Sequence, residues 1–253
     1  MAKQIVQSLW IGNKLSIMEN LCIKSFLKND YDYHLYTYNF VENVPEGTII
    51  KDANEILDNS EVYSYANSSF SAISNRFRFE LLYKRGGMWV DTDVICIKKY
   101  DMGNDKYIIF SESNKKYNEQ KIGACILKFP IGDPILLDAI QICKDKKKDI
   151  IDGTLVWGLG PSTVKHLVEK YNLEQYVKPW KFANSCSCHH VLSIINPDFK
   201  TGDPKGYASS VDELSPDTYF IHLWHEFWRR NNIDKDAKFP EKSLFEGLKA
   251  LYF

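Results

Sequence analysis

The chain has 253 residues, and its 32 basic and 33 acidic side chains leave a formal net charge of −1. A balance this close to neutral argues against nucleic-acid binding through bulk positive charge. No apolar stretch approaches the roughly 18–20 residues of a membrane-spanning helix. Residues 1–7 lack the apolar core of a signal peptide. We therefore expect a cytoplasmic protein without nucleic-acid partners.

The first half of the chain predicts alternating strands and helices. In chain order we expect strands over 5–11, 33–38 and 48–51. A helix from Ser16 to 29–30 should lie between the first two strands. A short helix over 55–57, capped by Asp52 or Asn54, should follow the third strand. This alternation is typical of an α/β fold with a mostly parallel central sheet flanked by helices.

A longer amphipathic helix is expected next, with Ser68 or Ser69 as its N-cap. Its apolar positions are spaced by 3, 4 and 4 residues, the helical pattern, at Phe70, Ile73, Phe77 and Leu81. The pair Gly86-Gly87 is expected to end this helix, because glycine accepts the left-handed conformation found there. The same pair is expected to let the backbone approach a ligand closely.

The second half of the chain is less regular. We expect strands over 88–91, 94–97, 107–110, 122–128, 191–195 and 218–221, and helices that begin at Pro134, begin near Gly158 and cover 243–251. No linker divides the sequence, so we expect a single domain over 1–253 with an irregular C-terminal half.

The sequence Asp91-Thr92-Asp93 follows the strand after the two glycines. Residues i and i+2 of a strand point to the same face, so the carboxylates of Asp91 and Asp93 should project together. Two convergent carboxylates suit a hard divalent cation, which can neutralise a diphosphate. Asn75 and Arg78 share one face of the preceding helix. The planar fork of an arginine suits a diphosphate.

These residues carry a family resemblance. Ser74-Asn75-x-x-Arg78 followed by Gly86 to Asp93 resembles the signature of DXD-containing glycosyltransferases, among them the family 32 capsular-polysaccharide, α-mannosyl- and α-galactosyltransferase-like enzymes and the glucosylating domain of large clostridial toxins. The strand over 5–11, the turn at Gly160-Pro161 and the segment 221–228 extend it. The resemblance implies a GT-A-like nucleotide-sugar-binding fold, with a nucleotide-binding half over 1–110 and an acceptor-binding half over 111–253.

The resemblance also implies roles for individual residues. Asp93 would ligate the metal directly, and Asp91 would bind ribose and approach the metal. His222 would be the C-terminal metal ligand, with His225 as the alternative. Arg78 would bind donor phosphate or sugar hydroxyls, Trp10 would stack on the base and Trp228 would line the diphosphate pocket. Asn75 is a departure, because the family usually carries Asp there for contact with ribose or donor sugar. Asn keeps the size and an acceptor oxygen but loses the charge.

The function implied is that of a metal-dependent, retaining glycosyltransferase. Such an enzyme moves a hexose or N-acetylhexosamine from a nucleoside diphosphate sugar, with UDP favoured over GDP, to a glycan or lipid-linked glycan acceptor in polysaccharide synthesis. The expected cation is Mn²⁺ or Mg²⁺, which would stabilise the leaving diphosphate. A nucleotidyltransferase that makes sugar nucleotides and a non-catalytic nucleotide- or glycan-binding module are the alternatives.

Two further segments allow other interpretations. The segment from Cys186 to His190 has cysteines and histidines, but they are too close together for an ordinary tetrahedral zinc site. Arg229-Arg230, near several aromatic residues, is compatible with peripheral contact to an anionic membrane, at its inner face. Packing at the protein surface is the alternative for this second segment.

Overall fold

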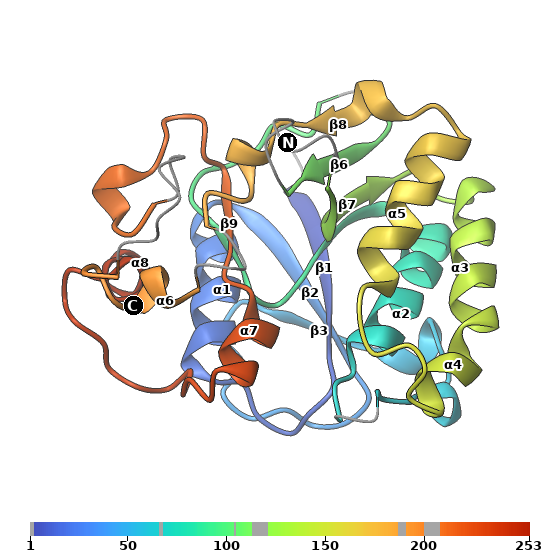
Figure 1. Cartoon of the computed structure of the whole chain (residues 1–253), viewed down its shortest axis with the longest axis horizontal. Coiled ribbons are helices and arrows are strands. Elements are labelled where there is room, and N and C mark those ends of the chain that lie inside the picture. Colours follow the sequence, from blue (N-terminus) through green and yellow to red (C-terminus); the bar gives the residue numbers. More distant parts are fainter. Residues whose placement is uncertain (1–2, 66–67, 104, 113–120, 187–190, 200–207) are drawn as a thin grey trace.

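A computed structural model describes residues 3–65, 68–103, 105–112, 121–186, 191–199 and 208–253. Its central sheet has seven strands in the order β3-β2-β1-β4-β7-β6-β8, and Figure 1 shows this sheet between the flanking helices. The strands are β1 (Gln4–Trp10), β2 (Tyr31–Thr37), β3 (Ile49–Asp52), β4 (Gly87–Val90), β6 (Ile108–Ser111), β7 (Ile122–Phe129) and β8 (Val177–Lys178). Within the described sheet only β7 runs antiparallel to its neighbours, which confirms the predicted mostly parallel α/β sheet.

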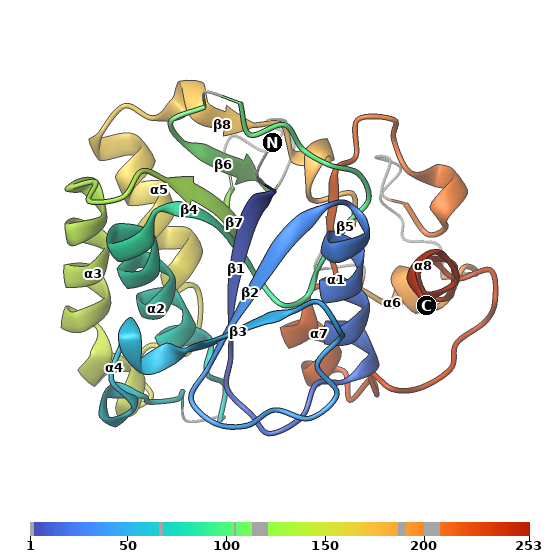
Figure 2. The same cartoon turned by 180° about the vertical axis from the view of Figure 1, so that it is seen from behind.

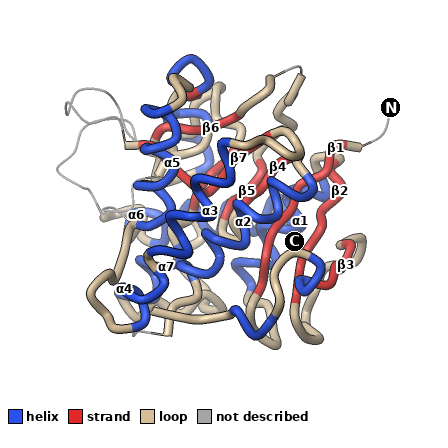
Figure 3. Tube along the Cα trace, turned by 90° about the vertical axis from the view of Figure 1, so that its right-hand side faces the viewer, coloured by secondary structure: helices blue, strands red, loops and turns tan. Residues whose placement is uncertain are grey.

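Helices cover both faces of this sheet. One face carries α2 (Ser71–Arg85), α3 (Ile135–Asp145), α4 (Lys147–Ile151) and α5 (Leu159–Lys170). Figure 3 shows α2, α3 and α5 lying over the strands. The other side carries α1 (Ile17–Lys28), α6 (Leu192–Ile195), α7 (His225–Arg230) and α8 (Leu244–Tyr252). The flanking helices that the sequence predicts are therefore confirmed.

The strands divide their side chains between two cores. Trp89 of β4 packs with Phe77 of α2 on one face, whereas Met88 and Val90 pack on the opposite face. This alternation follows from the two-residue period of a strand. Because β4 lies between β1 and β7 and is buried on both faces, its C-terminal end has a fixed position in the molecule.

The first part of the sheet matches the sequence prediction closely. Figure 2 shows β1, β2 and β3 side by side with α1 beside them. Helix α1 begins after Ser16, whose hydroxyl and the Glu19 carboxylate form a capping box. This reciprocal arrangement satisfies two backbone donors at the helix start. The short helix after β3 is a 3₁₀ turn over Ala53–Glu55 capped by Asp52, so it lies earlier than the predicted 55–57.

The predicted cap of α2 is wrong. The N-cap position is Phe70, and no side chain caps it, because Ser68 has a left-handed backbone (φ 63°) and the Ser69 hydroxyl donates to Ser71 instead. Phe70 therefore precedes the helix and is 40% exposed, whereas Ile73, Phe77 and Leu81 are fully buried as predicted.

Gly86 ends α2 as predicted, but neither glycine of the pair lines the cavity that contains Asp91. Gly86 has φ 63°, and a Cβ built there would lie 2.7 Å from the backbone nitrogen of Ile131. The pair sits at the N-terminal end of β4, opposite the end that carries Asp91. Gly86 therefore lies against the loop after β7, and this close approach requires glycine at position 86.

A second, two-stranded sheet joins distant parts of the chain. It pairs β5 (Val94–Cys96) antiparallel with β9 (Phe220–His222). The strand predicted over 191–195 is wrong, because residues 192–195 form α6, which packs against α8. A short apolar run does not distinguish a strand from a buried helical turn.

No helix in the described ranges combines the length and the apolar character that crossing a bilayer requires. Five of the six cysteines are free and buried, as expected for small core residues, and Cys188 lies outside the described residues.

Candidate functional site

The two aspartates lie in a turn at the C-terminal end of β4. The strand ends at Val90, the Asp91 nitrogen donates to the Cys125 carbonyl at 2.8 Å, and the Val94 nitrogen donates to the Asp91 carbonyl at 3.1 Å. The two carboxylates converge as predicted, but strand alternation is not the reason. A turn that leads from β4 into β5, not a continuing strand, brings the two carboxylates together.

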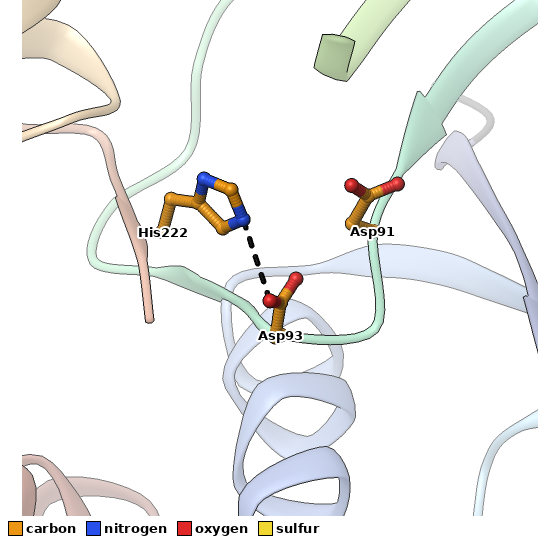
Figure 4. A group of neighbouring side chains, drawn as sticks. All are labelled: Asp91, Asp93 and His222. Atoms are coloured by element: carbon orange, nitrogen blue, oxygen red, sulfur yellow. Dashed lines mark ion pairs between the residues drawn. The ribbon is translucent and has the colours of Figure 1, made fainter. Parts of the chain in front are cut away.

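Asp91, Asp93 and His222 form a cluster of three metal-ligating side chains (Figure 4). One ligand atom from each residue lies within 4.8 Å of the others. His222 reaches the aspartates because it pairs with Val94 across the β5–β9 ladder. The structure thus brings together the two aspartates and the histidine named from the sequence, across more than half of the chain.

Asp91 is oriented by contacts to one of its two oxygens. Its Oδ1 accepts from an Arg78 terminal nitrogen at 2.5 Å and from Trp89 Nε1 at 2.7 Å. Arg78 in turn donates to Asn75 Oδ1 at 2.9 Å. Burial raises the pKa of Asp91 above its usual value, and Arg78 opposes that rise. Since Arg78 and Trp89 occupy Oδ1, Oδ2 is the oxygen available to a ligand.

Asp93 is oriented from the other side of the site. Its Oδ2 lies 3.3 Å from His222 Nε2 and accepts from the His225 backbone nitrogen at 2.8 Å. Although burial raises the pKa of Asp93, His222 and His225 lower it well below its usual value overall. Burial alone would lower the pKa of His222, but Cys125 and Asp93 hold it well above its usual value. Asp93 and His222 therefore form an ion pair.

His225 contributes its backbone to this arrangement. Its imidazole is not part of the three-residue cluster found among the described residues, although the residue lines the same cavity. Of the two histidines named from the sequence, His222 is the one whose ring nitrogen lies with the carboxylates.

Asn75 is packed tightly against the start of α5. A Cβ built on Gly160 would lie 2.3 Å from Asn75 Oδ1, so a larger residue there would displace the Asn75 side chain. Asn75 is buried, and its carbonyl oxygen accepts from Arg78. The glycine of the Gly160-Pro161 turn and the amide of Asn75 therefore form one contact that supports Arg78 and, through it, Asp91.

The cluster opens into a cavity of ≈ 990 Å³. Its lining includes six of the site residues named from the sequence, which are Trp10, Asn75, Arg78, Asp91, Asp93 and His222. A volume of this size is in the range of small-molecule and cofactor sites.

Trp228 does not line this cavity. It is fully buried, its Nε1 donates to the Leu223 carbonyl at 2.8 Å, and its ring packs on Phe239 and Phe245. The predicted contact with a diphosphate is therefore wrong in placement, because the turn of α7 directs this side chain toward α8 and into the core.

Glu112 is a cavity residue that sequence reasoning missed. It follows β6, and Gly123 on the paired strand leaves room for it, since a Cβ there would lie 3.2 Å from Glu112 Cγ. Burial raises the pKa of Glu112 to about 7. No motif surrounds Glu112, and only the β6–β7 pairing could have pointed to it.

The structure describes the cysteine- and histidine-containing segment only in part, and it describes Arg229 and Arg230 fully. Cys186 is buried and its carbonyl accepts from Trp224 Nε1, while 187–190 lie outside the described residues, so the zinc interpretation is not addressed. Arg229 and Arg230 both pair with Glu226. The membrane contact stays a prediction.

The sequence segment that carries the two aspartates matches a known family. Residues 17–113 match the family model described as "Glycosyltransferase sugar-binding region containing DXD motif". This match covers less than half of the chain and supports a glycosyltransferase activity. The matched range contains Asn75, Arg78, Asp91 and Asp93, whereas His222 lies outside it. No curated protein matches the chain.

Solved glycosyltransferases have a similar fold. A structure titled "PaToxG Glycosyltransferase" is 14% identical with a TM-score of 0.51, over 69% of this chain and 72% of that one. The glycosyltransferase GlyE of Streptococcus pneumoniae TIGR4 is 10% identical with a TM-score of 0.46, over 92% of this chain and 62% of its own. At these identities the likeness concerns the fold alone, and the PaToxG match supports the predicted GT-A-like architecture.

Proposed function

We propose that this glycosyltransferase moves a hexose or N-acetylhexosamine from a nucleoside diphosphate sugar to a glycan acceptor. In this proposal the reaction depends on Mn²⁺ or Mg²⁺, proceeds with retention at the anomeric carbon, and uses UDP in preference to GDP. The observation that carries it is the Asp91–Asp93–His222 cluster, which opens into a cavity beside the matched sugar-binding segment.

The side chains of the cluster fit a divalent cation. Two carboxylate oxygens and one imidazole nitrogen suit Mn²⁺ or Mg²⁺, which favour oxygen ligands and tolerate a histidine. Asp91 and Asp93 each have one oxygen engaged by protein donors, which leaves the other to face a ligand. Because His222 carries a raised pKa beside Asp93, cation binding would release a proton from it.

The protein's own residues would bind and orient the donor. Arg78 and Trp89 fix Asp91, while the β5–β9 ladder and the His225 amide fix Asp93. Trp10 lines the cavity at the end of β1, where its ring would stack on the base. A bound cation would supply charge stabilisation for the leaving diphosphate. The leaving phosphate would accept the acceptor's proton, so we assign no protein base.

The two alternatives have no observation in their favour. The family match supports a glycosyltransferase over a nucleotidyltransferase. Asn75 stands where the family usually carries Asp, and this departure is the feature that favours a non-catalytic binding module. In the structure the Asn75 amide supports Arg78, and a neutral oxygen is sufficient for that contact.

The proposal is tested by nucleotide release from a panel of UDP- and GDP-hexoses and UDP-N-acetylhexosamines, with Mn²⁺ and with chelator. We expect slow hydrolysis of at least one UDP-sugar that requires the cation. Turnover of a GDP-sugar alone would redirect the donor assignment. An absence of turnover with every donor, in protein that is folded by circular dichroism, would contradict the proposal.

A further inference from the structure

Three aromatic side chains from separate segments line the cavity beside the cluster. They are Phe70 before α2, Trp157 before α5 and Phe227 in α7. Phe70 is 40% exposed and Trp157 is 44% exposed. Large rings that stay exposed within a cavity mark a surface for a ligand, because their burial is favourable.

Trp157 is fixed in place by its neighbours. Its ring meets that of Phe227 at 5.8 Å and 89°, and the Arg230 guanidinium lies over it at 4.6 Å from the ring centroid. Arg230 is itself anchored, because its Nε donates to Glu226 Oε1 at 2.9 Å. One face of the indole is thus covered by a cation while the side chain keeps large exposure. A pre-oriented ring loses little entropy when a ligand stacks on it.

The aromatic group is continuous with the metal-ligating cluster. His222 and Trp224 have ring centroids 4.0 Å apart, and Trp224 and Phe227 are 6.3 Å apart. Trp224 has a left-handed backbone (φ 60°, ψ 50°), which turns the chain from β9 into α7. A residue other than glycine rarely adopts that conformation, and such strain concentrates at functional sites. The turn places Phe227 in a chain of ring contacts that runs from His222 through Trp224 and Phe227 to Trp157, whereas Trp10 lines the same cavity from the end of β1.

We propose that Trp157, Phe227 and Phe70 form the acceptor subsite and bind a pyranose ring stacked on the open face of Trp157. This inference rests on the proposed glycosyl transfer and names the acceptor as a hexopyranose of a glycan. A pyranose has an apolar face of C–H groups and a polar rim of hydroxyls. Stacking buries that face against the indole and leaves the hydroxyl rim free for the cluster and for water.

The test uses the whole chain with UDP, Mn²⁺ and three probes, the methyl glycosides of glucose, galactose and mannose. Saturation-transfer NMR is recorded for the wild type, Trp157→Ala and Trp157→Phe, and UDP affinity is measured calorimetrically in each. We expect transfer to the C–H protons of one sugar face in the wild type. Trp157→Ala should weaken sugar binding about tenfold or more, which is about 1.4 kcal/mol, and Trp157→Phe should retain most of it.

UDP affinity separates this inference from the proposed function. It should stay within about twofold in both variants, a change below 0.5 kcal/mol or so. Loss of UDP affinity in Trp157→Ala would place the base, not the acceptor, on this ring and overturn the inference. Equal sugar binding in wild type and Trp157→Ala, or no sugar binding to a wild type that binds UDP, would also overturn it. Absent UDP binding in the wild type would instead count against the proposed function.

Discussion

Asp91 and Asp93 are two residues apart, yet different regions of the molecule hold them. Asp91 is fixed from within the matched segment by Arg78 and Trp89. Asp93 is fixed from β9 and α7 by His222 and His225, about half a chain away. The site is therefore assembled where the regular sheet meets the irregular C-terminal half. One carboxylate depends on local sequence, and the other depends on long-range pairing.

The largest effect is expected from Asp93→Asn. This change removes a charged ligand and the partner of His222, so Mn²⁺-dependent turnover of a UDP-sugar should fall by about 10²–10³. Turnover is measured as nucleotide release, with the exposed Asp212→Asn as the matched control. Asp93 is only 9% exposed, and asparagine keeps its size, so the substitution removes the charge without opening a cavity. Comparable turnover in Asp93→Asn and Asp212→Asn would remove Asp93 from the site.

Arg78→Gln tests the locally held carboxylate. Without the guanidinium, Asp91 loses an oriented contact, and Mn²⁺ affinity should fall by about 10–100-fold, as for other residues that orient metal ligands. The pKa of Asp91 should rise further, since Arg78 makes the largest of the contributions that lower it. Mn²⁺ affinity is measured with UDP present. Arg85→Gln, which removes an exposed pair with Glu55, is the control and should leave the affinity unchanged.

Gly160→Ala tests the contact that supports Arg78. The added methyl would overlap Asn75 Oδ1, so the free energy of unfolding should fall by about 1–3 kcal/mol. Asn75→Ala removes the overlapped atom, and the double variant should recover about 1 kcal/mol of the loss. Urea unfolding of all four proteins closes the cycle. Strict additivity of the two changes would show that the residues do not press on one another.

The smallest effect concerns Glu112 and pH. Burial raises its folded pKa to about 7, above the ordinary glutamate value of 4.5. The native state therefore binds the extra proton, and the free energy of unfolding should fall as pH rises from about 4.5 to about 7. Glu112→Gln should remove about 1–2 kcal/mol of that decline, allowing for partial exposure. Thermal unfolding across this range checks it, and an unchanged slope would contradict a buried Glu112.

The sequence was sufficient for the part of the fold that local rules determine. Ser16 marks the start of α1 and Gly86 marks the end of α2, because helix caps depend on residues within a few positions of the helix end. The Asp91–Asp93 pair and its arginine were also readable, since the spacing itself carries the chemistry. These features lie within or beside the first sheet.

The features of the fold and the site that were not predicted depend on long-range contacts, which no local sequence pattern encodes. Trp228 sits in an aromatic run like its neighbours, and only the direction of α7 sends it into the core. Residues 192–195 fit a strand or a helix equally well until α8 is placed beside them. Glu112 enters the cavity because β6 pairs with β7 at a glycine. The positions of these side chains can be assigned only when the three-dimensional arrangement of the C-terminal half is known.

The most direct test of the account is Mn²⁺ binding in the presence of UDP, followed by the loss of the free-ion electron paramagnetic resonance signal. We predict one tight site in the wild type and in Asp212→Asn, and a strong loss of binding in Asp93→Asn and His222→Ala. Such a result would show that β4 and β9 together hold the cation. Equal binding in all four proteins would contradict a metal site at Asp91, Asp93 and His222.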